Sequence, residues 1–237
     1  MTLIITNDDG IDAPGIRALD RAVAKMGGGK IAIVAPRDPY SGCGHQVTTH
    51  APIQIVRRSE HEYSIAGTPA DCVRVGVKHL YPETELVLSG INHGGNMGMD
   101  IYISGTVAAV REAAFHGIPG IAISQYRAKD REIDWELASI LAIKSIDELL
   151  RQEYQPNTFW NVNLPHLQSN SPDPAIVFCS PCIRSLPVEF TVKKGEDSEY
   201  LTEYLTYAGN YQNRDRIANT DVDVCFSGNI AVSQIPL

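Results

Sequence analysis

Basic residues are too few in this sequence to make it positively charged: 20 lysines and arginines stand against 28 acidic residues, and the formal net charge is −8. This shortage argues against a nucleic-acid polymer or an anionic membrane surface as a partner. Cysteine is also scarce, and the odd number of five favours reduced thiols over a disulfide framework. No apolar run is long enough to cross a bilayer, and the first eight residues lack the basic segment of a secretory signal. We therefore expect a cytoplasmic protein without a membrane partner.

The rest of the composition is that of an ordinary globular chain. Hydrophobic residues make up 43% and charged residues 20% of the 237 residues, which is enough for a large α/β core with an extension. Over the first half, apolar strand-like runs alternate with helix-like segments. We predict strands at 3–6, 30–36, 53–56, 63–66, 85–90 and 120–124, with helices capped by Asp12 and Thr68 and a third helix at 106–117. This alternation predicts an α/β fold with a doubly wound, mostly parallel sheet.

Beyond residue 125 the pattern changes to a C-terminal β-rich extension. A long amphipathic helix is expected within 133–154, followed by strands at 159–165 and 175–179 and a half-buried strand within 220–232. The polar stretch 193–219 suggests an exposed hairpin or an arm that packs on a neighbouring subunit, and it carries Tyr200, Tyr204, Tyr207 and Tyr211. We interpret residues 1–237 as one domain, with a core at 1–125 and the extension at 126–237.

Two adjacent carboxylates, Asp8 and Asp9, follow the first predicted strand. At about 4 Å apart they repel by roughly 4 kcal/mol at an effective dielectric of about 20, so something must compensate. Ser41 follows the second strand and Asn92 follows the strand at 85–90, and the carboxyl ends of parallel strands share one edge of a sheet. A hard divalent cation would offset the repulsion, with Asp8, Asp9, Ser41 and Asn92 as ligands. Oxygen-only ligation favours Mg²⁺, Mn²⁺ or Ca²⁺ over zinc.

A predicted helix start at Ser104, Gly105 and Thr106 belongs to the same edge. Free backbone N–H groups and the positive end of the helix dipole favour a bound phosphate there. Glycines in the neighbouring loops let the backbone approach a ligand closely. A cation beside an anion-binding helix terminus is the equipment of metal-assisted phosphoryl chemistry.

Each stretch also has a purely structural interpretation. The segment 7–10 is good turn chemistry, Ser41 and Asn92 are common loop residues, and Ser104 can simply cap a helix. The two cysteines in the Cys-Ser-Pro-Cys segment at 179–182 have redox spacing, but no second pair exists for zinc, and we interpret them as structural. What favours a functional site is that four oxygen-rich stretches share one predicted edge.

Two other classes of protein stay open at this point. A dinucleotide-binding oxidoreductase is suggested by the glycines at 42–47, but the third glycine of the motif is missing and no convincing helix follows. A non-catalytic sensor of nucleotide or metal on the same fold is the other alternative.

Five blocks of sequence, in order, resemble the stationary-phase survival protein SurE family. They are LIITNDDGIDAPGI, VAPRDPYSGCGHQVT, GTPADCVRVG, LVLSGINHGGNMGMDIYISGTVAAVREA and GIPGIAIS. Together they span most of residues 3–124, and weaker similarity continues in FWNVNLP and in the segment at 220–232. The sequence departs from the family pattern at Gln46, where serine is common, and over 165–215.

The resemblance implies a Rossmann-like fold and a metal-dependent phosphatase of nucleoside 5′-monophosphates, with 3′-monophosphates and short polyphosphate as further substrates. It implies one Mg²⁺ or Mn²⁺ per subunit on Asp8, Asp9, Ser41 and Asn92. Phosphate contacts fall to Asn96, Ser104, Gly105 and Thr106, and the catalytic group comprises Asp8, Asp9 and Asn96. The extension is expected to form a homodimer or homotetramer. Two mechanisms stay open. In one, a water that the cation activates and an aspartate orients attacks the phosphate; in the other, Asp8 itself is the nucleophile.

Overall fold

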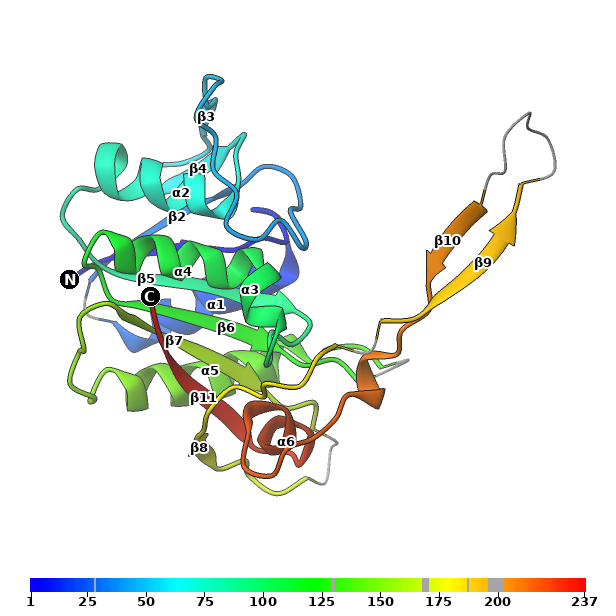
Figure 1. Ribbon diagram of the computed structural model, residues 1–237. Helices are drawn as coiled ribbons and strands as arrows, with labels where there is room; N and C mark the ends of the chain where they lie inside the picture. The colour runs from blue at the N-terminus through cyan, green and yellow to red at the C-terminus, as the bar shows by residue number, and fades with distance from the viewer. Residues whose placement is uncertain (28, 129–130, 168–170, 187, 196–202) are drawn as a thin grey trace.

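A nine-stranded sheet organises the chain in the computed structural model, which describes residues 1–27, 29–128, 131–167, 171–186, 188–195 and 203–237. Its strands lie in the order β3-β4-β2-β1-β5-β6-β7-β11-β8 (Figure 1). Their bounds are β1 Thr2–Thr6, β2 Lys30–Pro36, β3 Ile55–Arg57, β4 Glu62–Ile65, β5 Thr84–His93, β6 Gly120–Gln125, β7 Thr158–Leu164, β8 Ile176–Phe178 and β11 Ile230–Pro236. Within this sheet only the β3–β4 and β7–β11 pairs are antiparallel. The predicted mostly parallel α/β sheet is confirmed.

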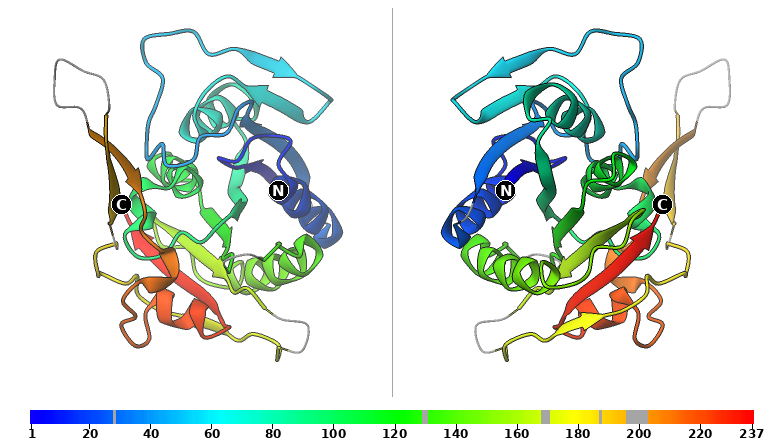
Figure 2. Two further views of the ribbon diagram at one scale, coloured as in Figure 1. Left: turned by 90° about the vertical axis from the view of Figure 1, so that its right-hand side faces the viewer. Right: turned by 90° about the vertical axis from the view of Figure 1, so that its left-hand side faces the viewer.

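Helices cover both faces of the sheet (Figure 2). One face carries α1 (Pro14–Met26) and α5 (Trp135–Leu149), and the other carries α2 (Pro69–Val75) with its π-helical continuation η1 (Gly76–Leu80), and α4 (Gly105–Phe115). The short α3 (Asp100–Ile103) precedes α4. Strand β1 is buried along its whole length, with Leu3 and Ile5 in the core under α1 and α5 and Ile4 in the core under α2. A strand covered on both faces reads as a continuous apolar run, which is why β1 was predictable.

The predicted start of α2 is confirmed and that of α1 is wrong. Thr68 Oγ1 accepts a hydrogen bond from Asp71 N at 3.2 Å, and Asp71 Oδ2 accepts one from Thr68 N at 3.0 Å, which is a reciprocal capping box. For α1 the cap position falls on Ala13, with no side-chain cap bond, and not on Asp12. The Asp12 carboxylate instead accepts from Arg58 Nη1 at 2.7 Å, a partner that is distant in sequence.

The predicted strand within 220–232 is also corrected. Residues Asp221–Phe226 form helix α6, and only then does β11 begin. Val222, Val224 and Cys225 are all buried, in a cluster with Met97 and Cys182. Alternation over so few residues does not separate a strand from a short helix.

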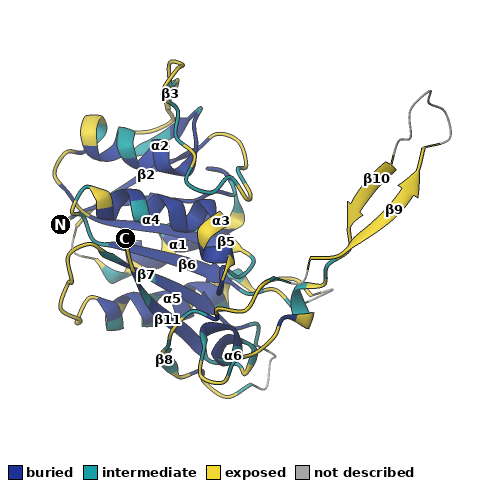
Figure 3. Ribbon diagram, in the orientation of Figure 1, coloured by how far each residue is buried: buried dark blue, intermediate teal, exposed yellow. Residues whose placement is uncertain are grey.

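The extension also contains a hairpin that projects away from the sheet (Figures 1 and 3). Strands β9 (Phe190–Lys194) and β10 (Glu203–Tyr207) pair antiparallel, and every residue of both is exposed. Of the two alternatives for 193–219, the exposed hairpin is confirmed for the part that carries Tyr204 and Tyr207, whereas Tyr200 lies outside the described residues. Tyr211 lies instead in the short 3₁₀ helix η2 (Tyr211–Asn213), where its hydroxyl donates to Gly95 O at 3.0 Å. In the described part of the chain, no helix is both long and apolar enough to traverse a lipid bilayer.

Candidate metal and phosphate site

The carboxyl ends of β1, β2, β5 and β6 meet at one edge of the sheet, on the right in Figure 1. Strand β1 lies between β2 and β5, and the helices that follow β1 and β4 cover opposite faces. A strand order that reverses in this way leaves a crevice where ligands bind in open α/β sheets. Asp8, Asp9 and Asn92 lie at this edge.

Asp8 is buried, with only 4% of its surface exposed. Thr106 Oγ1 donates a hydrogen bond to Asp8 Oδ1 at 2.5 Å. Burial raises the pKa of Asp8 to about 6, and the charge of Asp9 adds to this rise while the hydrogen bonds from Thr106 oppose it. The carboxylate therefore sits in an environment that favours a nearby positive charge.

Gly105 explains how the N-terminus of α4 comes so close to Asp8. A Cβ atom at this position would lie 2.8 Å from Asp8 Cβ and 3.0 Å from Cys43 Sγ. Real Cβ atoms do not approach so closely, so a larger residue would push the helix away from the carboxylate. Ser104 Oγ accepts from Val107 N at 3.1 Å and caps the helix. The predicted anion-binding helix start thus faces Asp8 itself.

Asp9 and Asn92 are held by the end of β5. The backbone N–H of His93 donates to Asp9 Oδ2 at 2.9 Å. Asn92 Nδ2 donates to Gly94 O at 2.8 Å, which leaves the side-chain oxygen as the atom that can bind a cation. Strand β5 runs to His93, beyond its predicted end, and its register with β6 shifts between Ser89 and Asn92. Gly90 makes the shift possible, because a Cβ there would lie 2.3 Å from Ile123 O.

Ser41 lies in the long loop after β2 and its side chain is exposed. Its neighbour Tyr40 donates a backbone hydrogen bond to Asp8 O at 2.7 Å, so the loop passes close to the aspartates. Among the described residues, no hydrogen bond joins Ser41 to Asp8, Asp9 or Asn92. The fold brings three of the four predicted ligands to one place and holds the fourth in an adjacent loop.

A buried carboxylate that the sequence did not reveal anchors that loop. Glu112 of α4 accepts hydrogen bonds from His45 Nε2 at 2.8 Å and from Arg74 Nε at 2.7 Å. Burial would raise the pKa of Glu112, but these bonds from His45 and Arg74 outweigh it and lower the pKa to about 2. Gln46 is exposed, and its backbone oxygen accepts from Thr68 Oγ1 at 2.6 Å.

Asn96 is fixed by two asparagines of the extension. Its backbone N–H donates to Asn163 Oδ1 at 2.8 Å, and its carbonyl accepts from Asn161 Nδ2 at 2.9 Å and Asn163 Nδ2 at 3.0 Å. Asn96 Nδ2 donates to Ser124 Oγ at 2.9 Å. Sequence reasoning missed Asn161 and Asn163, although two asparagines on one face of a buried strand are an unusual pattern that could have flagged them.

The loop that carries Asn96 is also supported from the C-terminal side. Arg214 Nη2 donates to Met97 O at 3.0 Å, and Arg214 Nη1 donates to Asp100 Oδ2. Asp221 Oδ2 accepts from Gly98 N at 2.7 Å. Residues of the extension therefore complete the site that the first half of the chain begins.

The donor set fits a hard divalent cation. It offers two carboxylates and amide and hydroxyl oxygens, which magnesium and manganese prefer. The four predicted ligands include neither a thiolate nor an imidazole, which are the usual ligands of zinc. Within the described ranges there is no group of three or more His, Cys, Asp or Glu side chains that could hold a metal. The glycine-containing segment 42–47 lies in a loop without a helix, so the dinucleotide motif lacks its structural context. Cys179 and Cys182 are free thiols.

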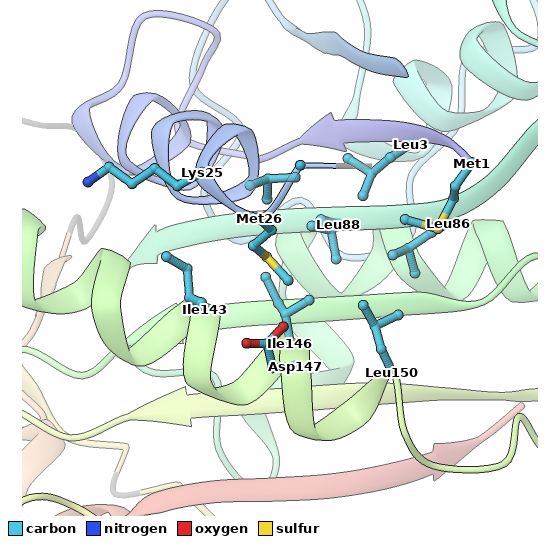
Figure 4. A pocket seen from close by; sticks show the side chains of 12 residues that line it. Met1, Leu3, Lys25, Met26, Leu86, Leu88, Ile143, Ile146, Asp147 and Leu150 are labelled. Atoms are coloured by element: carbon cyan, nitrogen blue, oxygen red, sulfur yellow. The ribbon is translucent and has the colours of Figure 1, made fainter. Parts of the chain in front are cut away.

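A separate cavity lies at the opposite, amino-terminal edge of the sheet (Figure 4). It has a volume of about 450 Å³ and is lined mainly by apolar side chains, among them Leu3, Met26, Leu86, Leu88 and Ile146. None of the predicted site residues lines it.

Comparison with known proteins identifies the family to which the chain belongs. Residues 3–185 match the family model described as "Survival protein SurE". A protein of Nostoc sp. (strain PCC 7120) is 54% identical over 235 residues, covering 99% of both chains. The protein named 5′-nucleotidase SurE of Clostridium beijerinckii is 44% identical over 219 residues, covering 89% of this chain and 79% of its own. The crystal structure of the SurE protein from Aquifex aeolicus superposes with a TM-score of 0.84 at 30% identity, covering 100% of this chain and 93% of that one. The chain belongs to the SurE family.

Proposed function

We propose that this protein is a divalent-metal-dependent phosphomonoesterase that converts nucleoside 5′-monophosphates to nucleoside and phosphate. Nucleoside 3′-monophosphates and short polyphosphate are further substrates in this proposal. The observation that carries it is the buried Asp8, packed against Gly105 and Thr106 at the N-terminus of α4 beside Asp9. Relatives that bear the name 5′-nucleotidase support the same activity.

One Mg²⁺ or Mn²⁺ would be held by Asp8, Asp9, Ser41 and Asn92. When bound, the cation supplies Lewis-acid stabilisation of the charge that develops on the phosphate. Asn96, Ser104 and Gly105 are proposed to contact that phosphate, with the N–H groups at the start of α4 as donors. The Thr106 hydroxyl is proposed to position Asp8 and not to bind phosphate, because it already donates its hydrogen bond to the Asp8 carboxylate.

The reaction is proposed to proceed by attack of water on phosphorus. Asp9 is less buried than Asp8 and one of its oxygens is held by His93 N, so it is suited to orient that water. Asp8 is a poorer nucleophile, since one oxygen accepts from Thr106 and the side chain is pressed against Gly105. Trapping with beryllofluoride separates the mechanisms, because an adduct on Asp8 would identify it as the nucleophile.

The competing hypothesis of a non-catalytic sensor is tested by phosphate release. We expect the protein to release phosphate from AMP with Mn²⁺ and to stop when EDTA is added. Binding of AMP without release would favour the sensor, and release that persists in EDTA would contradict the metal-dependent mechanism.

We further propose that the protein is a cytoplasmic homodimer or homotetramer, with neither nucleic-acid polymer nor membrane as a partner. Support comes from the hairpin, where Phe190 is 52%, Val192 58% and Leu205 60% exposed. Apolar side chains on a projecting arm gain burial only against another surface, and a second copy of the chain supplies one. Sedimentation measurements on the full chain would determine the oligomeric state.

A further inference from the structure

A cavity of about 660 Å³ opens directly beside Asp9. Its walls come from the N-terminal ends of α1 and α5 and from the end of β5, and they include Asp9, Pro14, His93, Arg127, Glu132 and Trp135. This volume lies in the range of roughly 300–1,000 Å³ that is usual for small-molecule sites. Unlike the apolar cavity in Figure 4, it reaches the candidate metal site, because Asp9 forms part of its wall.

Trp135 provides an aromatic wall whose position is fixed. It is the first residue of α5, and the Asp134 side chain caps that helix by accepting from Glu136 N and Leu137 N, both at 3.0 Å. A Cβ at Gly15 would lie 3.0 Å from Trp135 Cζ3, so the indole packs closely against α1. The half-buried ring is therefore held in place while part of it faces the cavity.

His93 connects this wall to the candidate phosphate site. Its backbone N–H donates to Asp9 Oδ2 at 2.9 Å, and its ring centroid lies 6.3 Å from that of Trp135. A phosphate ester whose phosphate binds the cation proposed at Asp8 and Asp9 can therefore direct its alcohol portion past Asp9 into the cavity. Arg127 and Glu132 also line the cavity, and both are exposed. They offer one positive and one negative charge to polar groups of the alcohol portion.

We infer that this cavity receives the nucleoside of the substrate and that Trp135 stacks on its base. The inference rests on the proposed function and adds a specificity-determining residue to it. An aromatic face beside an exposed guanidinium and a carboxylate matches a nucleoside, which combines a flat base with ribose hydroxyls and ring donors and acceptors. A simple sugar phosphate would not use the aromatic wall.

Binding is tested first without turnover. In a Trp160→Phe background Trp135 is the remaining tryptophan, and adenosine should quench its fluorescence with a saturable dependence on concentration. Trp160 packs against Phe178 and lines neither the cavity nor the phosphate site, which makes it a suitable position for the background change. Absence of quenching by adenosine would overturn the inference.

The second test compares two substrates in each variant. Trp135→Leu should raise the ratio of KM for AMP to KM for ribose 5-phosphate by about tenfold, the loss expected for one base–aromatic stack. Trp135→Phe, which keeps an aromatic ring, should restore most of the ratio. Because the ratio is taken within one protein sample, partial unfolding of a variant does not move it. A ratio equal to that of the wild type in Trp135→Leu would overturn the inference.

Failure of the proposed function would look different. If the wild type released phosphate from neither ester but adenosine still quenched Trp135, the nucleoside pocket would stand and the phosphatase would not. If both esters were hydrolysed and neither the ratio nor the fluorescence responded, the phosphatase would stand and the pocket would be refuted.

Discussion

The carboxyl edge of the sheet and the β9–β10 hairpin are built in opposite ways. At the edge, Asp8 and Asn96 are buried and their polar atoms have partners from distant parts of this chain. On the hairpin, every residue is exposed and the apolar side chains of Phe190 and Val192 have their surface in solvent. The edge is thus preorganised by the chain itself, whereas the hairpin gains burial only from another surface. Substitutions at the edge should therefore affect activity, and at its buried positions stability as well, whereas substitutions on the hairpin should affect association.

The largest effect is expected from Asp9→Ala. Removing a proposed ligand carboxylate should lower metal-dependent phosphate release from AMP by ~10³-fold or more, since metal stabilisation of the transition state is worth several kcal/mol. Calorimetric titration should show loss of Mn²⁺ binding, while the melting temperature changes little. Asp12→Ala is the matched control, because Asp12 is exposed and pairs with Arg17 and Arg58 on the surface. Unfolding of Asp9→Ala would instead identify the aspartate as a turn-forming residue.

Gly105→Ala tests the close packing at the edge directly. The added methyl group would lie 2.8 Å from Asp8 Cβ and must displace the carboxylate or the helix. We expect a loss of about 1–3 kcal/mol in the free energy of unfolding, as for other overpacked sites. Because small misplacements of catalytic groups cost about 100-fold in rate, kcat should fall by a similar factor. Wild-type kcat in this variant would show that the contact between α4 and Asp8 is not required.

The raised pKa of Asp8 predicts how the stability of the metal-free protein depends on pH. The folded state holds the proton more tightly than the unfolded chain, whose pKa is near 3.8 against about 6 in the fold. The protonated Asp8 side chain therefore stabilises the fold fully below pH 3.8, the pKa of the unfolded chain. As pH rises through about 6, the pKa in the fold, this stabilisation of about 3 kcal/mol is lost.

Urea unfolding in EDTA between pH 4 and 7 measures this dependence. Asp8→Asn should abolish the corresponding slope, so the difference between the two proteins isolates the carboxyl group. Saturating Mn²⁺ should oppose the loss in the wild type, because a cation favours the charged form. Identical pH profiles for both proteins in EDTA would contradict the prediction.

His45→Ala sharpens the role of the loop that carries Ser41. It removes a hydrogen bond to the buried Glu112 and should cost about 1–3 kcal/mol of stability. Looser anchoring of the loop should also weaken Mn²⁺ binding several-fold, which calorimetric titration would detect. His50→Ala is the matched control, since His50 lies exposed in the same loop. If both substitutions changed Mn²⁺ binding equally, the hydrogen bond between His45 and Glu112 would not be what positions the loop for the metal.

The smallest effect on the fold is expected on the hairpin. Val192 and Leu205 are directly opposite each other in its register. Replacing both by lysine should change the free energy of unfolding of the isolated subunit by no more than about 0.5 kcal/mol, as for other surface substitutions. Sedimentation velocity should nevertheless show smaller assemblies than the wild type. Unaltered assembly would mean that the hairpin does not join subunits.

Much of the fold could be predicted from local patterns. Apolar runs such as Leu3–Ile5 and the capping pair Thr68 and Asp71 act through neighbours in sequence, and the structure confirms the strand and helix that they indicate. The failures occur where local patterns are ambiguous. The helix begins at Pro14, one residue later than a cap at Asp12 requires, and the Asp12 carboxylate accepts from Arg58 instead. The segment at Asp221–Phe226 is helical because it packs its apolar side chains against residues of other loops.

The sequence by itself determined which residues stand at the ends of the parallel strands, because the loops that follow parallel strands lie at one edge of the sheet whatever the strand order. That was enough to nominate Asp8, Asp9 and Asn92. Only the tertiary structure decided what holds these residues in place: Asn161 and Asn163 on Asn96, Glu112 under His45, and Trp135 beside His93. Their partners lie tens of residues away along the chain, and a hydrogen bond or ring contact over such a separation exists only once the sheet and both helical layers have formed.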